Sequence, residues 1–296
     1  MAQTIVRSAL RPRWHDERTY VAFGDMLGFA ALVEGGGRIE EDSLFDSHRR
    51  WYEMWAHTHH RRHGRAGTPP PPAWARPKAL WGRRRAAEVE RRFILFNQIL
   101  TSMLEKYSFP TQMTAIAFSD SFFLATNGMQ EMLAFCTGLM ITLISNGIPM
   151  RMGIARGSFC VHGNSQSTTA MRRVNVVQFL GSGVVRAHKA ESSGLKGLRI
   201  GLHRSLLTRG PALGTEIALP LPREQRQACC KHELNYLFPL FLGPEPTVVQ
   251  EQVIESVTAM RNGLGPGSKH TLHYDQTLTA LSAMKRSGRG RFRGAL

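Results

Sequence analysis

Two aspartates inside otherwise apolar runs are the residues of this sequence best suited to chemistry. Asp25 interrupts residues 20–29 (YVAFGDMLGF), and Asp120 interrupts residues 115–124 (AIAFSDSFFL). An ionised carboxylate is costly to bury unless it is paired or binds a metal ion. We therefore predict that the two aspartates share a site for divalent cations. Carboxylates that hold such cations are common in enzymes that act at phosphorus.

The segments that must position these aspartates are predicted to be strands. In a strand over residues 19–27, Val21, Phe23 and Asp25 share one face, and Asp25 lies near the carboxyl end, where open α/β sheets often bind ligands. Residues 112–118 and 121–126 predict two strands joined by a tight hairpin with Asp120 at its tip. Helical periodicity over residues 86–107 and 129–146 predicts helices before and after this hairpin.

The pattern of the second half continues this alternation. One long strand is predicted for residues 148–161, then a polar loop and a strand over 174–180. A helix over 181–193 precedes a strand at 198–202. Further on, we predict a short strand near 216–219, an extended stretch at 234–241 and helices over 246–260 and 274–284. This order is typical of an α+β fold, with an antiparallel-rich sheet covered by helices on one face.

Composition and charge limit the size of the core, the class of partner and the location that we expect for this protein. The chain has 296 residues, 42% of them apolar, which is enough for a real core. The net charge of +16 favours an anionic partner, although a solvated basic surface explains it equally well. No apolar run reaches the roughly 20 residues of a membrane span, and residues 1–8 do not resemble a signal peptide, so we expect a cytoplasmic protein. The cysteines show no CxxC spacing and read as reduced thiols.

The same features suggest how the chain is divided. We expect a polar arm at residues 1–18, a catalytic domain at 19–204, a C-terminal extension of the core at 205–284 and a basic tail at 285–296. Residues 38–88 read as a basic insertion within the domain, with a helix at about 42–62 and a loop that contains four consecutive prolines at 69–72.

Four segments, in this order, resemble the catalytic domain of class III nucleotidyl cyclases. They are residues 23–29 (FGDMLGF), 118–121 (FSDS), 149–154 (PMRMGI) and 181–191 (GSGVVRAHKAE). The resemblance covers about residues 19–204 and implies a ferredoxin-like, palm-type sheet. It also implies that Asp25, Asp120 and the backbone carbonyl of Met26 bind two Mn²⁺ or Mg²⁺ ions per active site.

Substrate-binding residues are expected close to the first aspartate. Backbone amides of residues 26–29, at a turn into a helix, are placed to receive phosphate oxygens, and Gly28 permits a close approach. We assign Phe23, Leu27, Gly28 and Phe29 to substrate binding. Arg156 joins them, because an arginine on a central strand requires an anion, either a phosphate or a structural carboxylate.

The helix at 181–193 departs from the family pattern. The family has asparagine and arginine where this chain has Val185 and Lys189. Arg186 lies three residues before Lys189, so we expect the two on one helix face. We assign Arg186 and Lys189 as the catalytic residues that stabilise the charge of the transition state.

The forms of these segments look most like the pyrimidine cyclases of the Pycsar anti-phage defence systems. That resemblance implies a homodimer that converts UTP, or alternatively CTP, to cyclic UMP or cyclic CMP and diphosphate. Each site would take its metals from one protomer and the helix with Lys189 from the other. The product would be a second messenger that activates a separate effector protein.

Other readings remain open from the residues alone. They are a purine cyclase, a palm-type two-metal enzyme of another activity, an inactive cyclase-like regulator and a basic nucleic-acid-binding protein. We expect no stable nucleic-acid partner, because Asp25 and Asp120 would repel phosphate in the absence of a metal.

Overall fold

A computed structural model describes residues 17–27, 84–106, 113–118, 120–167, 173–209, 212–242, 245–264, 268 and 270–289. Several of the predictions lie outside these residues. They concern most of the N-terminal arm, nearly all of the basic insertion with its helix at 42–62, Gly28 and Phe29, and the tail from residue 290.

The centre of the fold is a seven-stranded sheet with the strand order β2-β3-β1-β4-β7-β9-β8. β1 (Thr19–Met26) lies between β3 (Ser121–Thr126) and β4 (Met150–Gly157) and is antiparallel to both. β2 (Met113–Phe118) continues the sheet on one side. On the other side, β7 (Ile200–His203) is parallel to β4, and β9 (Cys230–Leu234) and β8 (Ala218–Pro220) follow in antiparallel pairs.

The order of elements along the chain confirms the predicted fold class. α3 (Arg84–Lys106) connects β1 to β2, and α4 (Met129–Ser145) connects β3 to β4. A β-α-β-β-α-β chain with strand order β2-β3-β1-β4 is the ferredoxin-like arrangement that palm-type folds share. α4 ends at Asn146-Gly147, where Gly147 adopts the left-handed conformation that favours glycine (φ 67°).

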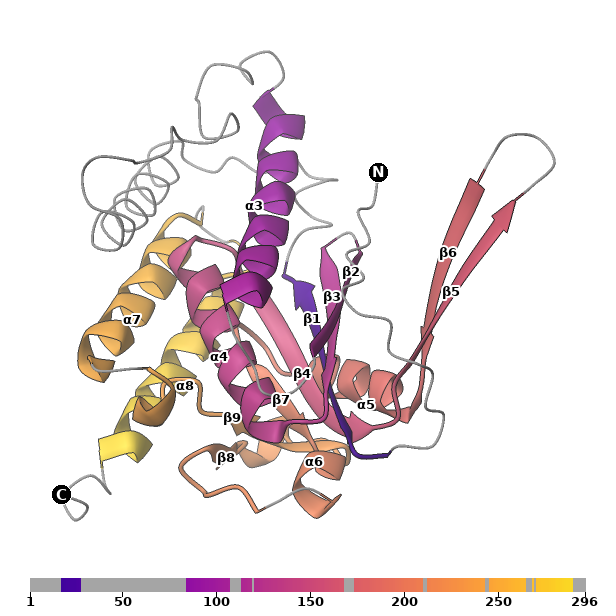
Figure 1. Ribbon diagram of the computed structural model, residues 1–296. Coiled ribbons are helices and arrows are strands. Elements are labelled where there is room, and N and C mark those ends of the chain that lie inside the picture. The colour runs from indigo at the N-terminus through magenta and orange to yellow at the C-terminus, as the bar shows by residue number, and fades with distance from the viewer. Residues whose placement is uncertain are drawn as a thin grey trace, which may run out of the picture.

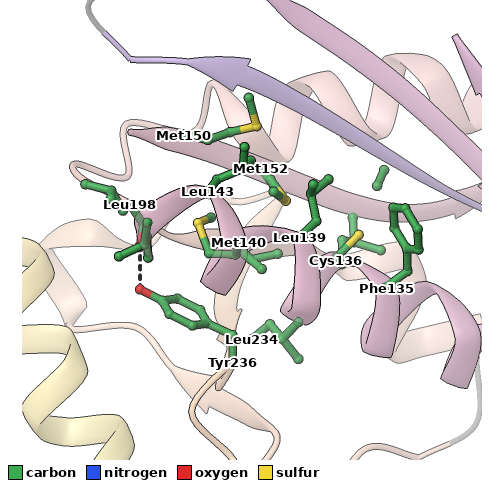
Figure 2. Packing of buried hydrophobic residues seen from close by; sticks show 14 of the residues in the cluster. Phe135, Cys136, Leu139, Met140, Leu143, Met150, Met152, Leu198, Leu234 and Tyr236 are labelled. Carbon is green, nitrogen blue, oxygen red and sulfur yellow. Dashed lines mark hydrogen bonds between the residues drawn. The ribbon is translucent and has the colours of Figure 1, made fainter. Parts of the chain in front are cut away.

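One face of the sheet carries the main hydrophobic core. α3, α4, α7 (Pro246–Asn262) and α8 (Thr271–Arg289) pack there (Figure 1). Figure 2 shows Leu139 and Leu143 of α4 against Met150 and Met152 of β4. The buried hydroxyl of Tyr236 donates a hydrogen bond to the Leu198 carbonyl oxygen at 2.8 Å. The C-terminal helices thus share one core with the sheet.

The opposite face is also covered, so the expectation of helices on one face only is wrong. α5 (Ser182–Glu191) lies across β1 and β4 there, and Ala187 packs with Val21 and Ala155. The approach is unusually close at Gly153, where a Cβ atom would lie 2.2 Å from the Ala187 carbonyl oxygen. Only glycine fits at that position of β4.

The prediction of a single strand over residues 148–161 is wrong. β4 ends at Gly157, and β5 (Cys160–Ser167) pairs with β6 (Arg173–Leu180) in a separate two-stranded sheet that projects from the body (Figure 1). The break occurs at Ser158, whose backbone N–H donates to Ser182 Oγ at 3.0 Å rather than to a neighbouring strand. β5 also replaces the polar loop that was predicted after residue 161.

Other differences are confined to the C-terminal part. The extended stretch predicted at 234–241 overlaps β9 only at Leu234 and contains a 3₁₀ helix, η4 (Pro239–Phe241). α6 (Arg204–Arg209) and η3 (Arg223–Gln225) were not predicted. α8 extends to Arg289, beyond the predicted end of its helix. Within the described ranges, no helix has the length and apolar character of a membrane-spanning segment.

Candidate functional site

Asp25 lies near the carboxyl end of β1, on the face that α5 covers. Its neighbours in the strand register are Ser121 on β3 and Arg151 on β4. Ser121 Oγ donates a hydrogen bond to Asp25 Oδ1 at 2.6 Å. Burial raises the pKa of Asp25 above its ordinary value, and the negative charge of Asp120 raises it further, whereas the Ser121 bond and the positive charges of Arg151 and His188 oppose this shift.

Asp120 lies at the tip of the β2–β3 hairpin, beside the end of β1. The backbone N–H of Met26 donates to the Asp120 carbonyl oxygen at 3.0 Å and so fixes the tip against the strand. The structure therefore brings the two predicted aspartates to one end of the central strands. Their mutual repulsion in a partly buried place suits a divalent cation, which would neutralise both carboxylates.

Further ligands would be needed to complete such a cation site. Among the described residues, no group of three or more histidines, cysteines, aspartates or glutamates is arranged to hold a metal ion. The Met26 side chain is buried in the main core, so only its backbone could contribute, as predicted. Oxygen atoms of a substrate phosphate would supply the remaining positions.

Phe23 and Leu27 are less available to a substrate than we predicted. The Phe23 ring is buried between the sheet and α5, with its centroid 4.7 Å from that of Phe123 and 5.2 Å from that of His188. The backbone N–H of Leu27 already donates to the Pro149 carbonyl oxygen at 2.9 Å. Phe23 therefore packs beneath Asp25 as part of the core, and the Leu27 N–H is already hydrogen-bonded within the chain.

Arg156 does not lie at this site within one chain. Its register partner on β1 is Tyr20, five residues before Asp25, which corresponds to about 16 Å along a strand. Its guanidinium lies over the Tyr20 ring, 5.9 Å from the centroid. Tyr20 belongs to the main core, on the face opposite Asp25. Within one chain, Arg156 therefore lies far from Asp25, and its assignment to substrate binding stays a prediction.

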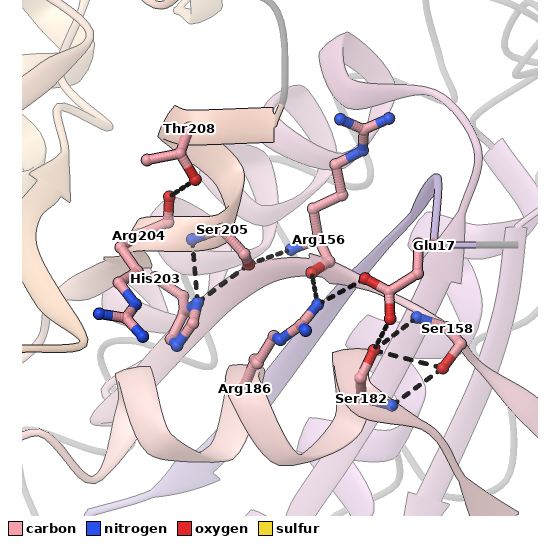
Figure 3. Close-up of polar contacts among 9 residues, drawn as sticks. All are labelled: Glu17, Arg156, Ser158, Ser182, Arg186, His203, Arg204, Ser205 and Thr208. Carbon is pink, nitrogen blue, oxygen red and sulfur yellow. Dashed lines mark hydrogen bonds and ion pairs between the residues drawn. The ribbon is translucent and has the colours of Figure 1, made fainter.

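The two predicted catalytic residues of α5 have different surroundings. Arg186 Nη1 donates to Glu17 Oε2 at 2.9 Å and to the Arg156 carbonyl oxygen at 3.0 Å, as Figure 3 shows. These contacts direct Arg186 toward the start of β1 and away from Asp25. Lys189 is exposed on the outer side of α5, together with Val185. Both charges nevertheless act on His203, whose pKa they lower, which agrees with neighbouring positions on α5. The catalytic roles of Arg186 and Lys189 stay predictions.

The sequence analysis missed two charged residues beside Asp25. Arg151 Nε donates to Glu191 Oε1 at 2.6 Å, and Arg151 Nη1 donates to the Leu195 carbonyl oxygen at 3.0 Å. Burial raises the pKa of Glu191, and the Arg151 charge opposes that shift. Both residues fall in the motifs at 149–154 and 181–191. An arginine on a predicted central strand and a glutamate at the end of a predicted helix could have been recognised in the sequence as candidates for a buried ion pair.

No protein-family model matches the chain, and no curated protein matches it. Among solved structures, the chain is similar to one described as a structural analysis of adenylate cyclases from Trypanosoma brucei in their monomeric state. The identity is 11% and the TM-score 0.36, over 74% of this chain and 88% of that chain. The strand order and the element order of the chain identify its fold independently of this similarity.

Proposed function

We propose that this chain is a divalent-cation-dependent nucleotidyl cyclase that acts on a pyrimidine nucleoside triphosphate. One observation carries the proposal: the register of β1 and β3 sets Asp25 opposite Ser121 and beside Asp120 at the end of the central strands. A ferredoxin-like sheet with two carboxylates at that point is suited to phosphoryl chemistry.

Cyclisation joins the ribose 3′-oxygen to the α-phosphorus, and diphosphate leaves. The bound cations would lower the pKa of the 3′-hydroxyl and neutralise the charge of the triphosphate. Asp25 and Asp120 would hold them, with the Met26 carbonyl as a further ligand. The 2.6 Å bond from Ser121 orients one oxygen of Asp25, and the Met26 N–H bond to the Asp120 carbonyl fixes the hairpin tip. Preorganised ligands of this kind lose little freedom on binding.

The active unit is proposed to be a homodimer. Arg186 points away from Asp25 of its own chain, and Lys189 and Val185 lie on the outer side of α5, where Val185 is 53% exposed. We propose that this outer side of α5 faces the second protomer. In such a dimer, Lys189 of one chain would stabilise the developing phosphate charge at the other chain's aspartates.

Substrate and biological role extend the proposal further. The forms of residues 23–29, 118–121 and 181–191 resemble those of pyrimidine cyclases, and we propose UTP as the substrate and cyclic UMP as the product, with CTP second. The cyclic nucleotide would serve in Pycsar antiviral defence by activating a separate effector protein. Mn²⁺ or Mg²⁺ would be the cation.

The direct test is incubation of the purified chain with each of the four nucleoside triphosphates and Mn²⁺, with products identified by mass. We expect cyclic UMP, and no product after chelation of the metal. Cyclic AMP or cyclic GMP as the main product would contradict the pyrimidine assignment. Template-dependent incorporation would instead indicate another palm-type enzyme. No turnover of any triphosphate by a folded dimer would indicate a regulatory protein.

A further inference from the structure

Arg151 lies directly beside Asp25 and yet is bonded elsewhere. The two residues are partners across the antiparallel pair β1–β4, so their side chains share the face that α5 covers. Directly opposed residues have Cβ atoms roughly 4.5–5.5 Å apart, which is within easy reach of an arginine. A guanidinium so placed would form a charge-assisted pair with the carboxylate. Instead, Asp25 Oδ1 accepts a hydrogen bond from Ser121.

Glu191 takes up the guanidinium of Arg151. Glu191 Oε1 lies 2.6 Å from Arg151 Nε and 2.5 Å from Arg151 Nη2, and Nη1 donates to the Leu195 carbonyl oxygen at 3.0 Å. The Glu191 side chain is 4% exposed and that of Arg151 is 18% exposed. All three nitrogens of the guanidinium therefore have partners other than Asp25.

The close packing of α5 sets the position of Glu191. Gly153 on β4 leaves room for the last turn of α5, because a Cβ atom there would lie 2.4 Å from the backbone nitrogen of Glu191. Gly201 on β7 does the same for the Ala190 carbonyl oxygen, at 2.8 Å. The backbone of Glu191 is thus held against the sheet, next to the strand position of Arg151.

We propose that Glu191 is a positioning residue that holds Arg151 away from Asp25 and so keeps the Asp25 carboxylate available to a divalent cation. This inference rests on the proposed function, because it requires Asp25 to bind a cation. Without the charge of Glu191, a mostly buried guanidinium loses its partner, which is costly. Asp25 is the adjacent carboxylate, and Arg151 would compete there with the cation.

The test is the Mn²⁺ affinity of the full chain without nucleotide, measured from the electron paramagnetic resonance signal of free Mn²⁺. Glu191→Gln should bind Mn²⁺ at least about tenfold more weakly than the wild type, as is typical when a group that orients a metal ligand is lost. Arg151→Gln and the Glu191→Gln/Arg151→Gln double variant should bind Mn²⁺ within about threefold of the wild type, because neither has the Arg151 guanidinium that would compete with Mn²⁺ for Asp25.

A matched control is another buried ion pair among the described residues, between Arg199, which directly precedes β7, and Glu233 of β9. Arg199 Nε lies 2.5 Å from Glu233 Oε2. Glu233→Gln also breaks a buried pair, but it should leave Mn²⁺ affinity unchanged. A Glu233→Gln variant that loses affinity as Glu191→Gln does would show a general effect of destabilisation and overturn the inference.

The remaining outcomes separate this inference from the proposed function. A wild-type chain that does not bind Mn²⁺ would overturn both. Wild-type affinity in Glu191→Gln, or a double variant as weak as Glu191→Gln, would overturn the inference alone. If Glu191→Gln does not fold, Glu191→Asp takes its place, because the shorter side chain keeps the charge but no longer reaches Arg151 at 2.6 Å. Weaker Mn²⁺ binding by Glu191→Asp that Arg151→Gln restores supports the inference, and wild-type affinity in Glu191→Asp overturns it.

Discussion

Gly153→Ala should be one of the most destabilising single-methyl additions in this protein. The added Cβ would lie 2.2 Å from the Ala187 carbonyl oxygen and 2.4 Å from the Glu191 backbone nitrogen. Heavy atoms prefer separations of roughly 3.5 Å or more, so α5 must move by about 1 Å. Both obstructing atoms belong to the helix backbone, and a rotamer change cannot relieve the clash.

The cost can be estimated from known effects of overpacking. Extra methylenes in a well-packed core cost about 1–3 kcal/mol, and we expect the upper end here, about 3 kcal/mol. For a domain of this size, that corresponds to a fall in the melting temperature of roughly 6–12 °C. Urea unfolding monitored by circular dichroism measures the change directly.

Gly263→Ala is the matched control. Gly263 follows α7, and a Cβ atom there would meet its nearest neighbour at 3.5 Å, which is ordinary contact. Its φ of −73° suits any residue. The free energy of unfolding should change by less than about 0.5 kcal/mol in this variant. If the free energy of unfolding of Gly153→Ala is no lower than that of Gly263→Ala, α5 does not pack as closely on β4 as these distances indicate.

Three further predictions concern pH, assembly and the tail. Burial and the nearby Arg186, Arg204 and Lys189 charges lower the pKa of His203 from 6.5 to about 4, so the folded ring stays neutral where the unfolded ring takes up a proton. From pH 7 to 5, the free energy of unfolding measured by urea titration should therefore fall by up to about 2 kcal/mol more in the wild type than in His203→Gln, and an equal fall in both would contradict this assignment. Mixing Asp25→Ala and Lys189→Ala chains should restore part of the turnover; a failure to complement despite proven subunit exchange would contradict the shared site. Deleting residues 290–296 should leave the maximal rate within about threefold of that of the full chain, and added salt should diminish any effect on KM. Loss of turnover in a folded dimer would instead place the tail in the active site.

The structure moves the boundary of that deletion. We predicted a tail from Lys285, but Lys285 Nζ lies 3.5 Å from Glu251 Oε1, and Asn235 Nδ2 donates to Ser287 Oγ at 3.0 Å. Residues 285–289 therefore belong to α8 and contribute to the fold. A deletion that starts at Lys285 would remove these contacts and would confuse loss of stability with loss of function.

Local patterns predicted the central part of the fold. The alternation of Val21, Phe23 and Asp25 gave both the strand and the face of Asp25, and the short link at Asp120 gave the hairpin. These features depend on residues close in sequence, and the strand register then brought the two aspartates together.

The errors arose where a distant partner decides the outcome. Apolar residues resume at Phe159 directly after Ser158, and only the bonds of Ser158 to Ser182 show that the chain leaves the sheet. Helical spacing placed Arg186 beside Lys189, but it could not show that Glu17, far away in sequence, forms an ion pair with Arg186. Arg156 was assigned by its type, and only the strand register shows that it lies on the face of the sheet opposite Asp25.

The central claim is that Asp25 and Asp120 together hold a cation in a nucleotidyl cyclase. The most direct test is the yield of cyclic nucleotide against Mn²⁺ concentration for the wild type, Asp25→Asn and Asp120→Asn, with Asp275→Asn as an exposed-carboxylate control that lies on α8. We predict saturable turnover in the wild type and the control, and a loss of more than about a hundredfold, or ~3 kcal/mol, in either site variant at every Mn²⁺ concentration. Full turnover of Asp25→Asn or Asp120→Asn at saturating Mn²⁺ would contradict the claim.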